Sequence, residues 1–130
     1  ALMCSLLEEG VRFLATNGDK GIKMNSRLYP ENGIVLAAIE SLTKITPIIV
    51  GKPNISMIDT ALKSIDNTDG STILIGDNLE TDIMAAQNAG LSSILILTGV
   101  TNEETADASD IKPTWRVRNY EELSKLVFPG

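Results

Sequence analysis

Apolar residues along this chain recur first at helical and then at strand-like spacing. The apolar positions of residues 2–7 lie one helical turn apart, and Gly10 is a suitable end for that helix. Two further stripes predict amphipathic helices, namely Val35, Ala38, Ile39 and Leu42, and then Ile55, Ile58, Leu62 and Ile65. Helices are also expected from about 80 to 89, ending at Gly90, and from about 120 to 127.

Short runs of apolar and β-branched residues, without polar alternation, predict strands that are buried on both faces. These runs lie at 11–16, 47–50, 72–75 and 93–97, with a further candidate at 115–117. Because helices separate the strands, we expect an α/β fold with a parallel sheet that is covered on both sides.

Two polar stretches separate these elements. Residues 17–32 are rich in Gly and Lys and are expected to form a long loop, which is either functional or simply a connector. A turn is expected at 67–70, and a polar loop rich in Asp and Glu lies between 97 and 115.

Composition narrows the classes of function. The 130 residues suffice for a compact domain with a real core, and 43% hydrophobic with 22% charged residues is typical of a globular chain. The formal net charge of -6, with scattered Lys and Arg, argues against a nucleic-acid binder. A small anionic substrate stays open, because a bound cation or local dipoles can override net charge. The absence of histidine excludes Ser-His-Asp and Cys-His catalysis and the common zinc ligand sets.

Cysteine content and the N-terminal residues predict a cytoplasmic location. Cys4 is the single cysteine, so no internal disulfide can form, and its apolar neighbours favour a small buried side chain over a nucleophile. No apolar stretch is long enough to span a bilayer, so no membrane partner is expected. Glu8 and Glu9 stand where an export signal would have basic residues, which argues against such a signal. The chain begins with Ala rather than Met, which suggests a processed, trimmed or partial chain.

An acidic loop follows the strand at 72–75. Gly76 allows a tight exit from the strand, Asp77 stands at its carboxyl edge, and Asp82 falls in the first turn of the next helix. Two carboxylates at one edge favour a hard cation such as Mg²⁺. Capping and dipole roles at a helix start explain the same residues equally well, so spacing alone leaves both interpretations open.

Lys52 stands between a predicted strand and a predicted helix. Gly51 permits a sharp turn, and Pro53 keeps Lys52 extended. Its ammonium could pair there with a phosphate or an acidic nucleophile, although a lone loop lysine is more often merely solvated. The surrounding residues do not form a Walker P-loop.

These features together resemble the haloacid dehalogenase (HAD) superfamily, and within it the p-nitrophenylphosphatase-like branch with a large α/β cap. That branch includes phosphoglycolate and pyridoxal phosphate phosphatases. The resemblance runs in family order through residues 13–19, Gly33, 37–40, 50–53, 76–83, 89–91, 95–100 and 112–113. Any one of these motifs is weak, whereas five or more in order are strong. The implied fold is a HAD-like Rossmannoid parallel sheet.

The resemblance implies a role for each matching position. Lys52 would neutralise the aspartyl nucleophile and the bound phosphate, and Asp77 would be a Mg²⁺ ligand. Asp82 would support the site through a bound water or through Lys52, with Asn78 nearby.

The resemblance also implies a domain organisation. Residues 1–50 would be the C-terminal part of the cap, and residues 51–130 the C-terminal part of the catalytic core. The loop that carries Asn17 and Asp19 would help to shape substrate access. The implied substrate is a small phosphorylated metabolite, and a homodimer through the cap is a possible assembly.

One departure from the family pattern limits the function of these residues. The family's nucleophile and general acid come from Asp-x-Asp-Gly after a strand, and no such motif occurs in this sequence. The nearest match, at 66–70, has one residue too many and precedes a strand; the early Ser/Thr motif is also missing, since Thr16 falls in the cap-like stretch.

We therefore expect the parent protein to be a Mg²⁺-dependent phosphatase acting through an aspartyl-phosphate, and this chain alone to be inactive. The alternative is a truncated, non-catalytic module that binds a phosphorylated ligand or a partner. A third is an α/β scaffold with capped helices and no site.

Overall fold

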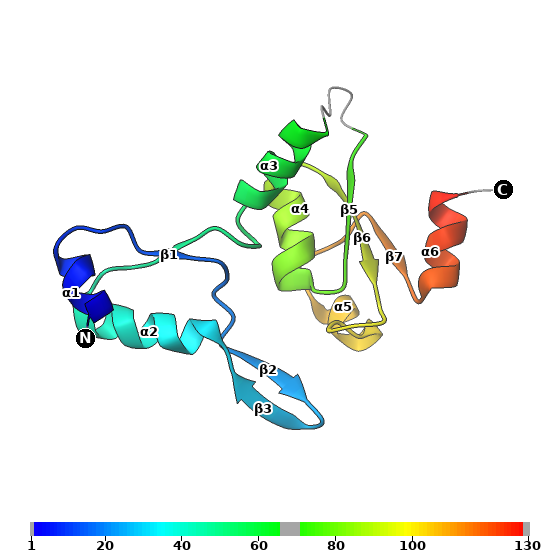
Figure 1. The fold of residues 1–130 in the computed structure, drawn as a ribbon. Coiled ribbons are helices and arrows are strands. Elements are labelled where there is room, and N and C mark those ends of the chain that lie inside the picture. Colours follow the sequence, from blue (N-terminus) through cyan, green and yellow to red (C-terminus); the bar gives the residue numbers. More distant parts are fainter. Residues whose placement is uncertain (1, 66–70, 129–130) are drawn as a thin grey trace. The chain divides into compact units, whose positions relative to one another are not determined.

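The computed structural model describes residues 2–65 and 71–128 and divides the chain into two compact units, Ala1–Gly51 and Lys52–Gly130 (Figure 1). Unit 1 contains α1 (Leu2–Glu8), β1 (Leu14–Ala15), β2 (Gly21–Met24), β3 (Arg27–Pro30), α2 (Asn32–Thr43) and β4 (Ile48–Ile49). Unit 2 contains α3 (Ser56–Ser64), β5 (Ile73–Gly76), the π-helical turn η1 (Leu79–Ile83), α4 (Met84–Asn88), β6 (Ser92–Ile96), α5 (Glu103–Ala108), β7 (Trp115–Val117) and α6 (Tyr120–Val127). The predicted turn at 67–70 and the nearest match to Asp-x-Asp-Gly, at 66–70, lie outside the described residues.

Unit 1 is built on a short parallel pair, in which Leu14 of β1 lies opposite Ile48 of β4. The predicted strands at 11–16 and 47–50 are thus present but much shorter. Helix α1 ends as predicted before Gly10, whose φ of 91° is a left-handed conformation that favours glycine. The buried core of this unit consists of Leu7, Phe13, Ala15 and Leu36.

Helix α2 forms as predicted but buries a different face. The first and last residues of the predicted stripe, Val35 and Leu42, are 55% and 73% exposed. The buried positions are Gly33 and Leu36, with Ile39 packed partly against the core. Apolar residues occur on more than one side of this helix, so its sequence permits more than one buried face. Leu36 is buried because its side of the helix packs against Leu7 of α1.

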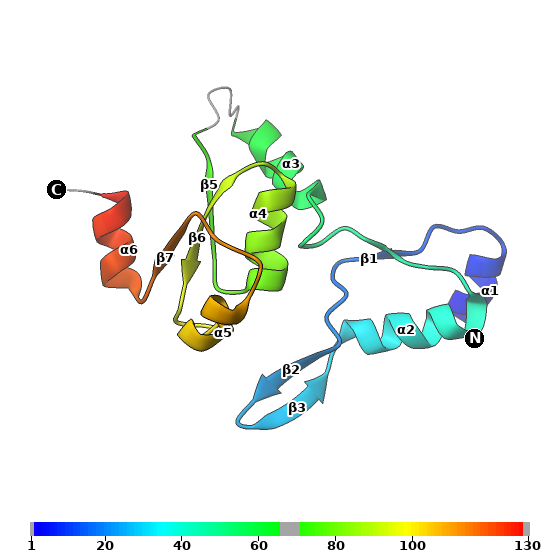
Figure 2. The same ribbon diagram turned by 180° about the vertical axis from the view of Figure 1, so that it is seen from behind.

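The prediction of a long loop over 17–32 is wrong. Strands β2 and β3 form an antiparallel hairpin in which Ile22 lies opposite Tyr29 (Figure 2). Its two-residue turn consists of Asn25 and Ser26, with φ of 49° and 62°. Two successive left-handed residues are typical of the tight turns that match strand twist, and Asn tolerates them better than most residues. The polar composition of the segment concealed this pattern.

Unit 2 contains a parallel sheet of order β5-β6-β7, in which Ile94 of β6 lies opposite both Ile75 and Trp115. Successive residues of β6 enter opposite cores, as expected for a strand buried on both faces. On one face Leu95 packs with Leu79, Ile83 and Ala106. On the other face, Ile94, Ile96 and Val117 pack with Leu123 of α6. The predicted α/β fold is confirmed.

Several element boundaries in unit 2 differ from the prediction. The helix expected at 80–89 begins as η1 and continues as α4 up to Gly90, which has a φ of 68°. Helix α5 lies within the predicted acidic loop. Its N-cap residue Asn102 accepts a hydrogen bond from the Thr105 amide at 2.8 Å, and Glu103 and Glu104 occupy its first turn. These are ordinary N-terminal helix signals that acidic composition hid.

Among residues 2–65 and 71–128, no helix is both long enough and apolar enough to cross a membrane.

Candidate functional site

The acidic loop folds back on itself at the carboxyl end of β5. Asp77 follows the last residue of the strand, and Asp82 lies five residues later within η1, where it is 5% exposed. Asp82 Oδ2 accepts hydrogen bonds from the backbone amides of Asp77 and Asn78, each at 3.1 Å. The predicted return of Asp82 to the strand's edge is therefore observed, and it occurs through these two backbone bonds.

The other oxygen of Asp82 binds Lys52. The distance from Lys52 Nζ to Asp82 Oδ1 is 2.5 Å, and the two side chains are 43% and 7% exposed. The peptide bond between Lys52 and Pro53 is cis. Lys52 is therefore held by an ion pair at the same edge of the sheet, with part of its side chain still open to solvent.

Asp77 is also held by the loop that follows β6. The Val100 amide donates to Asp77 Oδ2 at 2.8 Å, and the Thr101 amide donates to the Asp77 carbonyl oxygen at 3.0 Å. Among the described residues, none donates a hydrogen bond to Asp77 Oδ1. One carboxylate oxygen is thus fixed by the protein, and the other is available to a ligand.

Two glycines permit this close packing. A Cβ atom at Gly76 would overlap the carboxylate of Asp82, and one at Gly99 would overlap the carboxylate of Asp77. Any larger residue at either position would therefore displace the acid beside it. This requirement comes from space, because neither glycine has a left-handed φ.

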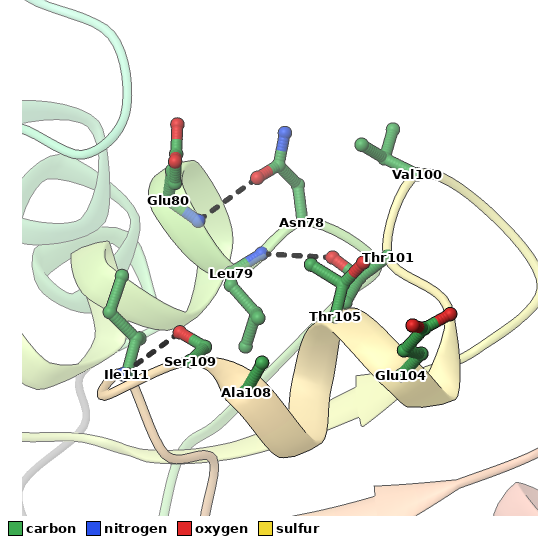
Figure 3. A pocket seen from close by; sticks show the side chains of 10 residues that line it. All are labelled: Asn78, Leu79, Glu80, Val100, Thr101, Glu104, Thr105, Ala108, Ser109 and Ile111. Atoms are coloured by element: carbon green, nitrogen blue, oxygen red, sulfur yellow. Dashed lines mark hydrogen bonds between the residues drawn. The ribbon is translucent and has the colours of Figure 1, made fainter.

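Asn78 fits the capping interpretation. Its Oδ1 accepts a hydrogen bond from the Glu80 amide at 2.9 Å, which caps η1 (Figure 3). Its predicted supporting place beside the metal site stays a prediction.

The predicted loop residues Asn17 and Asp19 belong to unit 1, whereas Lys52, Asp77, Asn78 and Asp82 belong to unit 2. The Asn17 carbonyl accepts from the Asn32 side-chain amide at 2.9 Å, and the Asp19 carbonyl accepts from the Gly33 amide at 2.7 Å. Both residues therefore help to hold the start of α2. Their predicted part in substrate access stays a prediction.

A cavity of about 650 Å³ lies beside the acidic loop, between η1 and α5 (Figure 3). Its walls include Asn78, Leu79, Glu80, Val100 and Thr101, together with side chains from α5 and from residues 109–111. Lys52, Asp77 and Asp82 do not line it. The cavity therefore adjoins the loop but is separate from the carboxylates.

The arrangement fits part of a Mg²⁺ coordination shell. Proteins commonly bind this ion through one or two carboxylates together with waters and phosphate oxygens of the substrate. Asp77 Oδ1 offers one such ligand. Within the described part of the chain, no three His, Cys, Asp or Glu side chains gather into a metal-binding group. A single open carboxylate oxygen is the kind of ligand that a protein contributes to an ion held jointly with other groups.

Comparison with known proteins identifies the family. The family model described as HAD-hydrolase-like matches residues 49–123, which is more than half of the chain. The chain belongs to this family. The matched residues include Lys52, Asp77 and Asp82.

Relatives and solved structures agree with this assignment and with the predicted branch. The 5'-nucleotidase YutF of Bacillus subtilis is 36% identical over 114 residues, which are 88% of this chain and 44% of the relative. The crystal structure of 4-nitrophenylphosphatase from Thermotoga maritima has a TM-score of 0.86 and 35% identity, covering 94% of this chain and 47% of that one.

A glycerol phosphate phosphatase from Mycobacterium tuberculosis, solved in complex with magnesium, has a TM-score of 0.83 and 29% identity. It matches 93% of this chain and 37% of that one. The chain therefore spans less than half the length of these relatives. The resemblance to HAD phosphatases of the p-nitrophenylphosphatase-like branch is confirmed.

The loop after β6 is a part of the site that the sequence did not predict. The family motif included Gly99 and Val100 but gave them no role, and Thr101 lay beyond it. The signal in the sequence is a glycine three residues after a buried strand, followed by the N-cap of a helix. That pattern indicates a loop at the same sheet edge as Asp77.

Proposed function

We propose that this chain is the C-terminal part of a Mg²⁺-dependent phosphate monoester hydrolase that acts through an aspartyl-phosphate. The observation that carries the proposal is the joint placement of Lys52, Asp77 and Asp82 at the carboxyl end of β5. The relatives support it, because YutF is a nucleotidase and the two solved structures are phosphatases.

Each residue would act through the contacts that it makes at the sheet edge. When bound, Mg²⁺ would supply Lewis-acid polarisation of a phosphoryl oxygen and offset its negative charge. Asp77 would hold the ion through Oδ1, since Oδ2 already accepts from the Val100 amide. Lys52 would direct its positive charge at the phosphate, and Asp82 would fix Lys52 and the backbone of Asp77 and Asn78.

The attacking carboxylate and the general acid would come from residues outside this chain. No Asp-x-Asp-Gly occurs in the sequence, and covalent catalysis requires a nucleophile next to its stabilising partners. In the intact protein, meaning the longest natural chain that contains these residues, residues 1–50 would be part of the cap and residues 51–130 part of the core. The boundary between the compact units, at Gly51 and Lys52, supports that division.

A small phosphorylated metabolite is the proposed substrate class. The homodimer through the cap and the cytoplasmic location stay predictions from the resemblance and from composition.

The purified 130-residue chain should hydrolyse no phosphate ester. With Mg²⁺ and p-nitrophenyl phosphate, nitrophenolate should be released no faster than in buffer without protein, because the chain contains no nucleophile. Mg²⁺-dependent turnover by this chain would contradict the proposed division of the active site. If the intact protein binds Mg²⁺ but also lacks turnover, the alternative of a non-catalytic module is correct.

Replacing Lys52 should impair the intact enzyme. Lys52→Ala removes the positive charge beside Asp82, and we expect kcat/KM to fall by about a hundredfold or more in a steady-state phosphatase assay. Lys125→Ala is the matched control, because Lys125 also forms an ion pair, with Glu121, but on the exposed surface of α6. A Lys52→Ala enzyme with wild-type kcat/KM would exclude the proposed role of this lysine.

A further inference from the structure

The loop after β6 determines where the carboxylate of Asp77 lies. It supplies two backbone donors to this one residue, from Val100 to the side chain and from Thr101 to the carbonyl oxygen. Gly99 removes the Cβ that would otherwise overlap the same carboxylate. The position of the Asp77 carboxylate therefore depends on backbone donors that lie 23 and 24 positions later in the chain.

Thr101 fixes that loop to the acidic loop through a second bond. Its Oγ1 accepts a hydrogen bond from the Leu79 amide at 3.3 Å, drawn as a dashed line in Figure 3. Thr101 and Leu79 are 4% and 3% exposed, so water has little access to either. Because a buried amide strongly requires an acceptor, this hydroxyl adds to the two backbone bonds that hold residues 77–79 and 100–101 together.

We propose that Thr101 is a positioning residue for the Mg²⁺ ligand Asp77, acting through its side-chain hydroxyl. This inference rests on the proposed function. Loss of the hydroxyl leaves the Leu79 amide unsatisfied and removes one of the three hydrogen bonds described above between the two loops. The two backbone bonds from Val100 and Thr101 then hold Asp77 less firmly, and the direction of Oδ1 is less well fixed. Groups that orient a metal ligand typically change metal affinity by 10–100-fold when removed.

The test is the dissociation constant for Mg²⁺ alone, measured by isothermal titration calorimetry on the intact protein. Thr101→Val has nearly the same shape but no hydroxyl, and should raise the dissociation constant about tenfold. Thr101→Ser keeps the hydroxyl and should stay close to wild type. Thr105→Val is the matched control, since Thr105 lines the same cavity from α5 but its side chain has no hydrogen bond to the acidic loop.

Kinetics give a second measurement that a purely structural role would not change. Thr101→Val should raise the Mg²⁺ concentration needed for half-maximal activity, while saturating Mg²⁺ should restore most of kcat. Thr101→Ala replaces Thr101→Val if the latter does not fold, as judged by Trp115 fluorescence and circular dichroism.

Asp77→Asn in the same titration separates the two hypotheses. If Asp77→Asn loses Mg²⁺ binding while the variant without the hydroxyl binds like wild type, the inference about Thr101 is wrong and the proposed function stands. If Asp77→Asn binds Mg²⁺ like wild type, the proposed function fails and the inference fails with it. A loss in Thr101→Val together with wild-type binding in Thr101→Ser and Thr105→Val confirms the inference.

Discussion

Asp77→Asn should reduce the Mg²⁺-dependent phosphatase activity of the intact protein by at least about a hundredfold. The amide keeps an oxygen that can accept from the Val100 amide, so the loop should retain its conformation. With that oxygen bonded to Val100, the side chain is uncharged and presents its NH₂ group at the position of Oδ1, and an NH₂ donor is not a ligand for Mg²⁺. The measurement is kcat/KM across a range of Mg²⁺ concentrations.

Asp107→Asn is the control for this substitution. Asp107 is also paired with a basic residue, since Arg116 Nη1 lies 2.6 Å from its Oδ1, but the pair lies between α5 and β7 and does not contact the acidic loop. The hydrogen bond that Arg116 donates to the Asp107 carboxylate also raises the pKa of Arg116, which stays charged at any ordinary pH. Activity lost equally in both variants would show that Asp77 has no special role.

Asp82→Ala should destabilise unit 2 by about 2–4 kcal/mol. The substitution leaves the amides of Asp77 and Asn78 without their acceptor and removes the buried partner of Lys52. Lys52 can turn to solvent because its side chain is 43% exposed, so most of the cost comes from the two amides. Asp82→Asn keeps one acceptor oxygen and should lose less stability.

Urea unfolding of the 130-residue chain measures the free energy of unfolding of unit 2. Trp115 is the single tryptophan and lies in β7, so its fluorescence reports on the sheet of unit 2. Asp107→Ala removes an exposed carboxylate with one ion pair and should shift the urea midpoint much less. If Asp82→Ala unfolds at the wild-type midpoint, Asp82 does not organise the loop.

The parts of the fold that follow from local pattern could be predicted from the sequence. The run at 93–97 became β6 because every residue of a strand buried on both faces can be apolar, and α6 begins and ends where predicted. The hairpin of β2 and β3 was missed because its apolar residues stand among Gly, Lys and Asn, and the burial of Leu36 in α2 depends on the partners within unit 1.

The candidate site could be predicted only in part. The spacing of Asp77 and Asp82 placed both acids at one strand end, and the local sequence placed Lys52 at a strand-to-helix junction, where the family pattern gave it a role. The hydrogen bonds that fix Asp77 join residues 23 and 24 positions apart in the sequence, from a loop whose course depends on the pairing of β5 with β6. No local pattern encodes such a contact, so the contribution of Val100 and Thr101 required the structure.

Asp77 is the residue through which we propose that this chain binds the metal ion of a phosphatase. The most direct measurement is a crystal structure of the intact protein with Mn²⁺ in place of Mg²⁺, in which anomalous scattering locates the ion. We expect an anomalous peak bonded to Asp77 Oδ1, with Lys52 still paired with Asp82. A peak elsewhere, with Asp77 Oδ1 free of any metal, would contradict the claim.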